Sequence, residues 1–289
     1  MNNTERCIQH MKKLITGKVR DVFAADADSL IIVTTDRISA FDVVLPTAIP
    51  GKGRALNQIS NFWFDFTQGI VPNHLIATKT ADMPGGFAEE GRTVQVRRLK
   101  MLPFEFIIRG YIFGNMWKAY QAGEPFCGQR ITGEYSLAEK LAAPIITPST
   151  KASEGHDVYI PLEELERALG AELAAKICAT CLALYEKCYG YALQQGIIIA
   201  DTKLEFGLDE DGALVLADEI FTPDSSRFWD AAAYKVGESP QSYDKQFVRD
   251  WLIEKHLDGV EPAPALPQNI VEETAALYRQ CLAKLTGIA

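Results

Sequence analysis

Long apolar segments and an excess of positive charge are both missing from this 289-residue sequence. Its apolar runs, such as residues 197–200 and 213–217, are far shorter than the roughly 20 residues that a helix needs to cross a bilayer. Charged residues interrupt the N-terminal segment, where a signal peptide would have an apolar block. The net charge of −9 disfavours a nucleic-acid binder, which usually has a basic face. We therefore expect a cytoplasmic protein with neither a membrane nor a nucleic acid as partner.

Cysteine is sparse as well. The cysteines at positions 7, 127, 178, 181, 188 and 281 do not form the dense framework of a secreted disulfide scaffold. Cys178 and Cys181 have the C-x-x-C spacing, but no second pair or histidine stands nearby to complete a zinc site. We expect core thiols, with a metal or redox role as the alternative. Apolar residues at 47% and charged residues at 23% are typical of a packed globular enzyme.

Hydrophobic periodicity predicts a mixed order of strands and helices. Strands are expected at residues 29–35, 93–99, 103–111, 197–206 and 213–220, and a tight turn at Asp211 and Gly212 joins the last two. Helices are expected at residues 55–68, 161–195 with a break at Gly170, 241–256 and 268–285. Residues 123–155, rich in Gly, Pro, Ser and Thr, indicate a functional loop. This order favours an α+β class with mainly antiparallel sheets.

The predicted hairpin at residues 197–220 carries the strongest chemical signal. Because strand side chains alternate, Asp201, Lys203 and Glu205 share one face. If Asp211 and Gly212 form a two-residue turn, the ladder places Glu205 opposite Asp218. Two facing carboxylates destabilise a strand pair, and a magnesium ion, which prefers oxygen ligands and phosphates, would relieve that repulsion. The alternative is an exposed hairpin with solvated charges.

Two clusters near the N-terminus could contact anions. Residues 17–21 read Gly-Lys-Val-Arg-Asp, in which Lys18 and Arg20 share a strand face and the glycine allows a ligand to come close. The G-x-x-x-x-G-K-[ST] pattern of a P-loop does not occur, and a solvated basic edge is the alternative. Residues 36–42, Asp-Arg-Ile-Ser-Ala-Phe-Asp, follow an apolar strand, where ligand contacts are common; an ordinary polar turn is the alternative there.

Two arginines farther along the chain also indicate anion binding. Arg109 interrupts the apolar strand at residues 103–111, and a buried guanidinium requires an anion. An internal ion pair with Glu105, on the same strand face, is the alternative to a ligand. Arg227 lies in segment 221–230, where hydroxyl groups beside two aromatic residues suit phosphate binding, and a surface arginine on an Asx-turn is the alternative.

Taken in order, these segments resemble the SAICAR synthase family over nearly the whole chain. Residues 200–207, Ala-Asp-Thr-Lys-Leu-Glu-Phe-Gly, are similar to the family signature D-x-K-x-E-[FI]-G, and residues 103–109 look like the start of a second signature. The motifs at 17–21, 36–42, 147–152 and 223–229 are further matches in the right order. One departure follows Arg109: the family has threonine or alanine, glycine and serine, whereas this chain has Phe113, Gly114 and Asn115.

The resemblance implies an ATP- and magnesium-dependent ligase of de novo purine biosynthesis. Such an enzyme joins a carboxyaminoimidazole ribonucleotide to L-aspartate and releases ADP and phosphate. Because a carboxylate is a poor acylating agent, ATP would first convert it into an acyl phosphate. The resemblance implies catalytic roles for Lys203 and Asp201, ATP binding by Lys18, Arg20, Glu205 and Asp218, metal binding by Glu205, Asp218, Asp201 and Asp157, and substrate binding by Ser39, Arg37, Arg109, Asn115, Lys151, Asp224 and Arg227.

The resemblance also implies a two-part fold related to ATP-grasp and kinase-like nucleotide folds. We expect a strand-rich ATP-binding subdomain at residues 1–98 and a larger α+β part at residues 99–289 that binds substrate and metal, with ATP between them. Residues 97–102 would join the two parts and could meet adenine through their backbone. A small-molecule kinase and a nucleotide-binding regulatory module are the alternatives. The sequence leaves the oligomeric state open.

Overall fold

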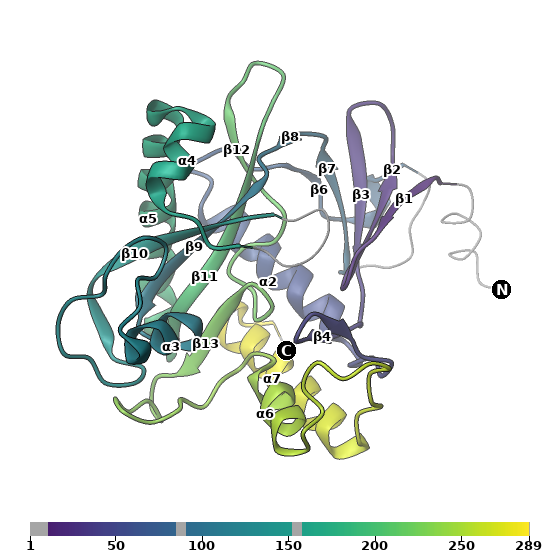
Figure 1. The fold of residues 1–289 in the computed structure, drawn as a ribbon. Coiled ribbons are helices and arrows are strands. Elements are labelled where there is room, and N and C mark those ends of the chain that lie inside the picture. Colours follow the sequence, from purple (N-terminus) through teal and green to yellow (C-terminus); the bar gives the residue numbers. More distant parts are fainter. Residues whose placement is uncertain (1–10, 85–90, 152–157, 289) are drawn as a thin grey trace.

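A computed structural model describes residues 11–84, 91–151 and 158–288 of the chain (Figure 1). The named strands pair antiparallel throughout, and together with the helices they confirm the expected α+β class. The strands are β1 (Lys13–Thr16), β2 (Arg20–Ala24), β3 (Ser29–Thr34), β4 (Ser39–Ala40), β5 (Val43–Val44), β6 (Leu75–Ala77), β7 (Thr93–Arg97), β8 (Lys100–Met101), β9 (Phe104–Tyr111), β10 (Lys140–Thr150), β11 (Ile197–Leu208), β12 (Leu214–Ala217) and β13 (Ser226–Asp230). The helices are α2 (Lys52–Phe66), η1 (Thr80–Asp82), α3 (Gly114–Ala122), α4 (Leu162–Leu169), α5 (Ala171–Gln194), α6 (Gln246–Glu254) and α7 (Gln268–Thr286).

The N-terminal part of the chain forms a five-stranded sheet in the order β1-β2-β3-β7-β6. Alternation along its strands separates two faces. Phe23, Ile31 and Val33 pack together in a small apolar cluster on one face. Val22 and Ile32, the alternate residues, point to the other face and line the cleft described below. The sheet therefore covers its own small core and offers its second face to a ligand.

The second sheet has six strands and is organised around β11, which has twelve residues. β11 pairs with β9, β12, β13 and β8 along its length. Apolar side chains of this sheet pack with those of α2, α5 and α7 in the largest core, where Phe106 and Phe206 meet edge to face. Figure 1 shows the two sheets beside each other, with α6 and α7 below them. This arrangement fixes β11, and with it Asp201, Lys203 and Glu205, at the centre of the molecule.

The two sheets come from separate stretches of the chain. The strands of the first sheet lie within residues 13–97 and those of the second within residues 100–230. However, α2 from the N-terminal stretch packs in the core of the second sheet. The expected division into residues 1–98 and 99–289 therefore stays a prediction, because strand order and core packing divide the chain differently.

The helix predictions are largely confirmed. Gly170 separates α4 from α5 with a φ of 86°, a positive value that suits glycine and ends the first helix. α7 closes the chain as expected. α6 is shorter than the predicted segment 241–256, because the Asp244 carboxylate accepts a hydrogen bond from the Gln246 amide (2.6 Å) and the helix begins only there.

The predicted loop at residues 123–155 contains β10, an eleven-residue strand, so that prediction is wrong for this part of the segment. Pro144 and Pro148 weaken the strand pattern because proline has no amide donor for the ladder. β10 lies at the edge of the sheet beside β9, and its register shifts between Lys140 and Ile145. An edge position and a local irregularity are the places where a sheet tolerates proline.

The turn between β11 and β12 is longer than predicted, and the register prediction is wrong. Glu205 pairs with Ala217 and not with Asp218. The Asp209 carboxylate accepts hydrogen bonds from the amides of residues 211 and 213 (3.2 and 2.8 Å), which closes a wider loop than a two-residue turn. The ladder is displaced by one residue as a result, and Asp218 lies beyond the end of β12 with a φ of 61°.

The five described cysteines are free thiols, all buried or half-buried. Cys178 and Cys181 belong to or pack against the largest core, as expected. Burial raises the pKa of Cys181 well above the usual value for a thiol. Cys7 lies outside the described residues. No helix in the described part of the chain has the length and apolar character of a membrane span.

Candidate active site

A cleft of about 1020 Å³ lies between the two sheets. A smaller cavity of about 150 Å³ shares Lys203, Asp224 and Tyr159 with its lining. The residues predicted from the sequence are distributed over both. The cleft is lined by Lys18, Arg20, Ser39, Asn115, Lys151, Lys203, Glu205, Asp218 and Asp224, and the smaller cavity is also lined by Arg109, Asp201 and Arg227. Two predicted residues are not among them: Arg37 lines neither space, and Asp157 lies outside the described residues.

Lys203 is the hub of the charged cluster in the cleft. Its ammonium nitrogen lies 2.9 Å from a carboxylate oxygen of Glu105, 2.6 Å from one of Glu205 and 3.6 Å from one of Asp218. Burial alone would lower the pKa of Lys203, but the three carboxylates raise it well above its usual value. Lys203 is therefore a firmly protonated cation that draws carboxylates from three segments to one point.

Glu205 and Asp218 meet through Lys203 and not by direct strand pairing. Glu205 is almost fully buried and also accepts a hydrogen bond from Lys151, whose side chain is half exposed. Asp218 accepts two hydrogen bonds from Arg20, which reaches across from β2. Burial would raise the pKa of Asp218, but Arg20 and Lys203 hold it well below the usual range. Asp218 is thus ionised at neutral pH, as a ligand for a cation must be.

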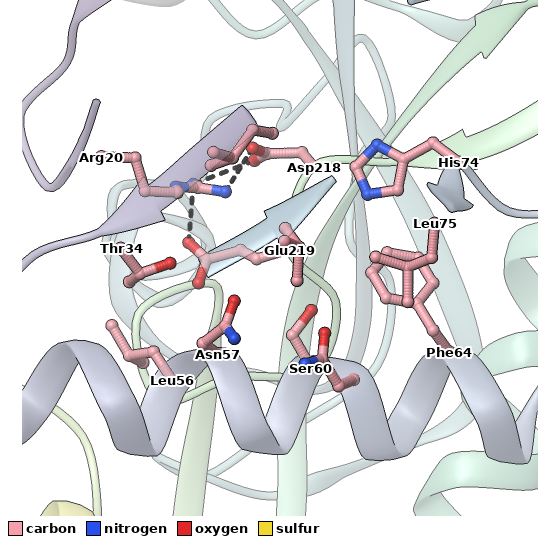
Figure 2. A pocket seen from close by; sticks show the side chains of 13 residues that line it. Arg20, Thr34, Leu56, Asn57, Ser60, Phe64, His74, Leu75, Asp218 and Glu219 are labelled. Atoms are coloured by element: carbon pink, nitrogen blue, oxygen red, sulfur yellow. Dashed lines mark hydrogen bonds and ion pairs between the residues drawn. The ribbon is translucent and has the colours of Figure 1, made fainter. Parts of the chain in front are cut away.

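Arg20 connects the first sheet to this cluster. Its guanidinium contacts Asp218 and, at 3.0 Å, the neighbouring Glu219 (Figure 2). Lys18, from the turn before β2, is more exposed and pairs with Asp42 at 2.5 Å. The first sheet therefore brings two cations to the cleft, one fixed against carboxylates and one at its mouth.

Arg37 supports this turn from the opposite side. It donates hydrogen bonds to the Gly17 carbonyl (2.9 Å) and to the Asp21 carboxylate (2.8 Å). These contacts hold the turn that carries Lys18. The substrate contact predicted for Arg37 remains a prediction, since its side chain is engaged here.

Arg109 and Arg227 form the wall of the smaller cavity. Arg109, which is 3% exposed, pairs with Asp201 at 3.2 Å and donates to the hydroxyl groups of Thr147 (2.9 Å) and Tyr159 (3.2 Å). Arg227 from β13 pairs with the same Asp201. The proposed alternative of an Arg109–Glu105 pair is wrong, because antiparallel pairing of β9 with β11 sets Asp201 opposite Arg109. One aspartate thus holds two guanidinium groups beside an open space.

Two side chains hold the Asp224 carboxylate in place. Its carboxylate accepts hydrogen bonds from the buried Lys52 (2.6 Å) and from the Tyr278 hydroxyl (2.6 Å). Ser39 of β4 and Asn115 at the start of α3 also line the cleft. The motifs that the sequence separates by up to two hundred residues therefore converge on one space.

Several residues of this site have no role predicted from the sequence. Glu219, Tyr159, Lys245 and Arg249 line the cleft, and no role was predicted for them. Lys245, the cap residue before α6, and Arg249 in its first turn are four residues apart, a spacing that turns two side chains of a predicted helix to the same side. Glu219 directly follows a predicted ligand, and Tyr159 stands alone in a weakly patterned segment, so neither gave a comparable signal.

Known proteins are similar to this chain over nearly its whole length. The family model of SAICAR synthetase matches residues 13–265. The chain belongs to the SAICAR synthetase family. Phosphoribosylaminoimidazole-succinocarboxamide synthases from Chromobacterium violaceum and Thioalkalivibrio sulfidiphilus are 49% and 51% identical to it, over 96% and 94% of this chain and 99% and 93% of theirs. Family membership makes the chain an ATP-dependent ligase of purine biosynthesis.

Solved structures are similar over the same length. The SAICAR synthase from Saccharomyces cerevisiae, solved in complex with SAICAR, has 41% identity and a TM-score of 0.87, with 96% of this chain and 95% of that chain covered. A SAICAR synthetase solved in complex with ADP has 26% identity and a TM-score of 0.71, with 95% and 97% covered. The fold of the SAICAR synthetase family therefore extends over nearly the whole chain.

Proposed function

We propose that this SAICAR synthetase family member joins the carboxylate of 5-amino-1-(5-phosphoribosyl)imidazole-4-carboxylate to the amine of L-aspartate. ATP would phosphorylate the carboxylate first, and the amine of aspartate would then displace phosphate from the acyl phosphate. The products are SAICAR, ADP and phosphate. The solved relatives, one with SAICAR and one with ADP, support a cleft that accepts both kinds of ligand.

The observation that carries this proposal is the position of Lys203 between two spaces. On one side lie Arg20, Glu205 and Asp218, a charged set suited to nucleotide phosphates. On the other side lie Arg109 and Arg227, two guanidinium groups suited to an anionic ribonucleotide. An ammonium between the two would stabilise the negative charge that develops when a phosphoryl group moves from one ligand to the other.

Magnesium fits the donor set of the cleft. Glu205 and Asp218 present carboxylate oxygens near the same ammonium, and magnesium is usually held by one or two carboxylates together with substrate phosphates. The described residues contain no group of three or more acidic, histidine or cysteine side chains placed to hold a metal by themselves, so phosphate oxygens would complete the shell. Bound there, magnesium would neutralise phosphate charge.

The second proposed metal position, at Asp201 and Asp157, has less support. Asp201 is 5% exposed and already pairs with Arg109 and Arg227. We infer that its carboxylate orients the two guanidinium groups toward the ribonucleotide. Lys151 reaches the cleft from the end of β10 through its pair with Glu205 and would complete the cationic wall around the phosphates. We also infer a cytosolic location, from the sequence features given above.

The decisive experiment supplies ATP, magnesium and the carboxylated ribonucleotide, with and without L-aspartate. ADP release that requires aspartate, together with a succinocarboxamide product in the mass spectrum, is the expected result. A small-molecule kinase would release ADP without aspartate, and a regulatory module would bind ATP without turnover. Either of those results would contradict the proposed reaction.

A further inference from the structure

Glu219 lies between two walls of the site: the nucleotide wall, which contains Arg20, and the ribonucleotide wall, which contains the loop at residues 222–227. Its two carboxylate oxygens have different partners: Oε1 accepts a hydrogen bond from Arg20 (3.0 Å), and Oε2 accepts one from the Thr222 hydroxyl (2.7 Å). Its side chain is only 11% exposed. One buried carboxylate therefore connects β2, in the first sheet, with the loop that follows β12.

Thr222 connects Glu219 to the ribonucleotide wall. Its hydroxyl oxygen donates to Glu219 and accepts hydrogen bonds from the amides of Asp224 and Ser225, each at 3.2 Å. The same loop places Asp224 in the cleft and leads directly into Arg227 on β13. A continuous series of hydrogen bonds thus links the cation of the nucleotide wall to the loop of the ribonucleotide wall.

The backbone around Glu219 is held in an unusual shape. Asp218 and Phe221, on either side, have left-handed φ angles of 61° and 48°. Such conformations cost energy for residues other than glycine and persist where surrounding contacts hold them. One such contact comes from α2, where the Ser60 hydroxyl accepts a hydrogen bond from the Ile220 amide (3.2 Å). The position of Glu219 is therefore set by the fold and not by its two partners alone.

Figure 2 shows Glu219 between Arg20 and the side chains of Asn57 and Ser60 on α2. The cavity at this place measures about 20 Å³, enough for about one water molecule. Arg20 and Thr222 are thus the only protein hydrogen-bond partners that the described residues give the Glu219 carboxylate. An exchange of its charge for a neutral group would act first on these two contacts.

We propose that Glu219 is a positioning residue that fixes Arg20 in the nucleotide wall and the 222–227 loop in the ribonucleotide wall at the same time. The inference rests on the proposed function, because it takes ATP and the carboxylated ribonucleotide as the two ligands. It predicts that one substitution weakens the binding of both, although neither ligand needs to touch Glu219.

The test measures two dissociation constants by calorimetry, one for a non-hydrolysable ATP analogue with magnesium and one for the carboxylated ribonucleotide. Glu219→Gln keeps the size of the side chain and removes its charge, and we expect both constants to rise on the order of tenfold, as for other lost supporting contacts. Thr222→Val should raise only the ribonucleotide constant, and Thr222→Ser, which restores the hydroxyl, should return it to the original value. Glu210→Gln, at an exposed position in the 209–213 loop, is the control and should change neither.

The double variant separates a shared link from general damage. If Glu219 and Thr222 act through one contact, the second substitution should add nothing to the first. The double variant, Glu219→Gln with Thr222→Val, should then bind the ribonucleotide as tightly as the single variant that has the lower affinity. Additive losses, or a Glu219→Gln protein that loses affinity for one ligand alone, would overturn the proposal. If Glu219→Gln does not fold, the contrast between Thr222→Val and Thr222→Ser decides the same link. If the protein without substitutions binds neither ligand, the proposed function is contradicted. If the variants bind both ligands normally, only the role of Glu219 is contradicted.

Discussion

Removal of one partner from the buried pair of Lys52 and Asp224 should be strongly destabilising. Lys52 begins α2 with no exposed side-chain surface, Asp224 has a side chain that is 3% exposed, and their charged atoms are 2.6 Å apart. Lys52→Met fills similar space but leaves Asp224 as a buried carboxylate with Tyr278 as its hydrogen-bond donor. Breaking such a pair from one side costs about 3 to 5 kcal/mol, and we expect the free energy of unfolding to fall by that amount.

The partner substitution and the pair together test the reasoning. Asp224→Asn leaves the lysine unpaired and should be costly as well, whereas the double variant removes both charges and should cost clearly less than the sum of the single variants. Urea unfolding followed by tryptophan fluorescence measures all three. Lys255→Met is the matched control: this lysine lies in an exposed pair with Glu254, and such pairs contribute about 1 kcal/mol or less. Additive costs, or a Lys52→Met cost as small as that of the control, would refute the argument.

The same pair gives a pH dependence with a defined sign. Burial alone would raise the pKa of Asp224, but Lys52, with Lys245 and Tyr278, holds it well below the ordinary value of 3.8. A carboxyl with a lowered pKa in the folded state contributes stability that is fully present above its unfolded value and is lost as the pH falls toward the folded value. The difference in unfolding free energy between the original protein and Lys52→Met should therefore be constant near neutral pH and shrink below about pH 4. A difference that grows on acidification would contradict this assignment.

Five further substitutions test the site itself. Glu205→Gln and Asp218→Asn each remove a charged oxygen and should lower magnesium-dependent ATP turnover by about tenfold or more, which is about 1.4 kcal/mol; near-normal turnover in both at ordinary magnesium would remove the metal assignment. Arg109→Lys keeps the charge but loses the planar fork, so ribonucleotide affinity should fall far more than ATP affinity in parallel titrations. Asn115→Ser should be tolerated, whereas Asn115→Leu should raise the KM for the ribonucleotide, with a loss of about 1 to 3 kcal/mol in binding free energy. An unchanged KM in Asn115→Leu would mean that Asn115 only shapes the turn.

The chemistry of β11 could be predicted from the sequence because it depends only on alternation. Asp201, Lys203 and Glu205 stand at every second position, and any extended strand would turn them to one face. Their neighbours depend on strand pairing across the sheet, which local patterns do not encode. For this reason the sequence suggests Glu105, on the same strand face, as an ion-pair partner of Arg109, whereas Asp201 on the adjacent strand is its partner.

Two further features of the structure, β10 and the burial of Lys52, could not be predicted from the sequence, and in each case the reason lies in particular residues. Two prolines argue against a strand at β10, because proline lacks the amide donor that a strand inside a sheet needs. β10 lies at the edge of its sheet, where this missing donor is tolerated. Lys52 gave no signal, since a lysine between two glycines at a helix start is usually solvated, and only the return of α7 with Tyr278 and the 222–227 loop buries it. Burial of this kind is decided by contacts between segments that lie far apart in the chain.

Glu205 and Asp218 lie near the same lysine although the predicted register of the β11–β12 hairpin is wrong, and the reason is physical. Direct contact between Glu205 and Asp218 would depend on their facing each other, and a shift of one residue would turn one of them away. In the structure the two carboxylates are joined by the Lys203 ammonium, whose long side chain reaches 2.6 Å from one and 3.6 Å from the other. Asp218 has left the ladder and takes a left-handed conformation, so its direction no longer follows strand alternation. The repulsion that suggested a cation between them is therefore already relieved by a lysine of the chain, and a metal bound by these carboxylates would share them with Lys203.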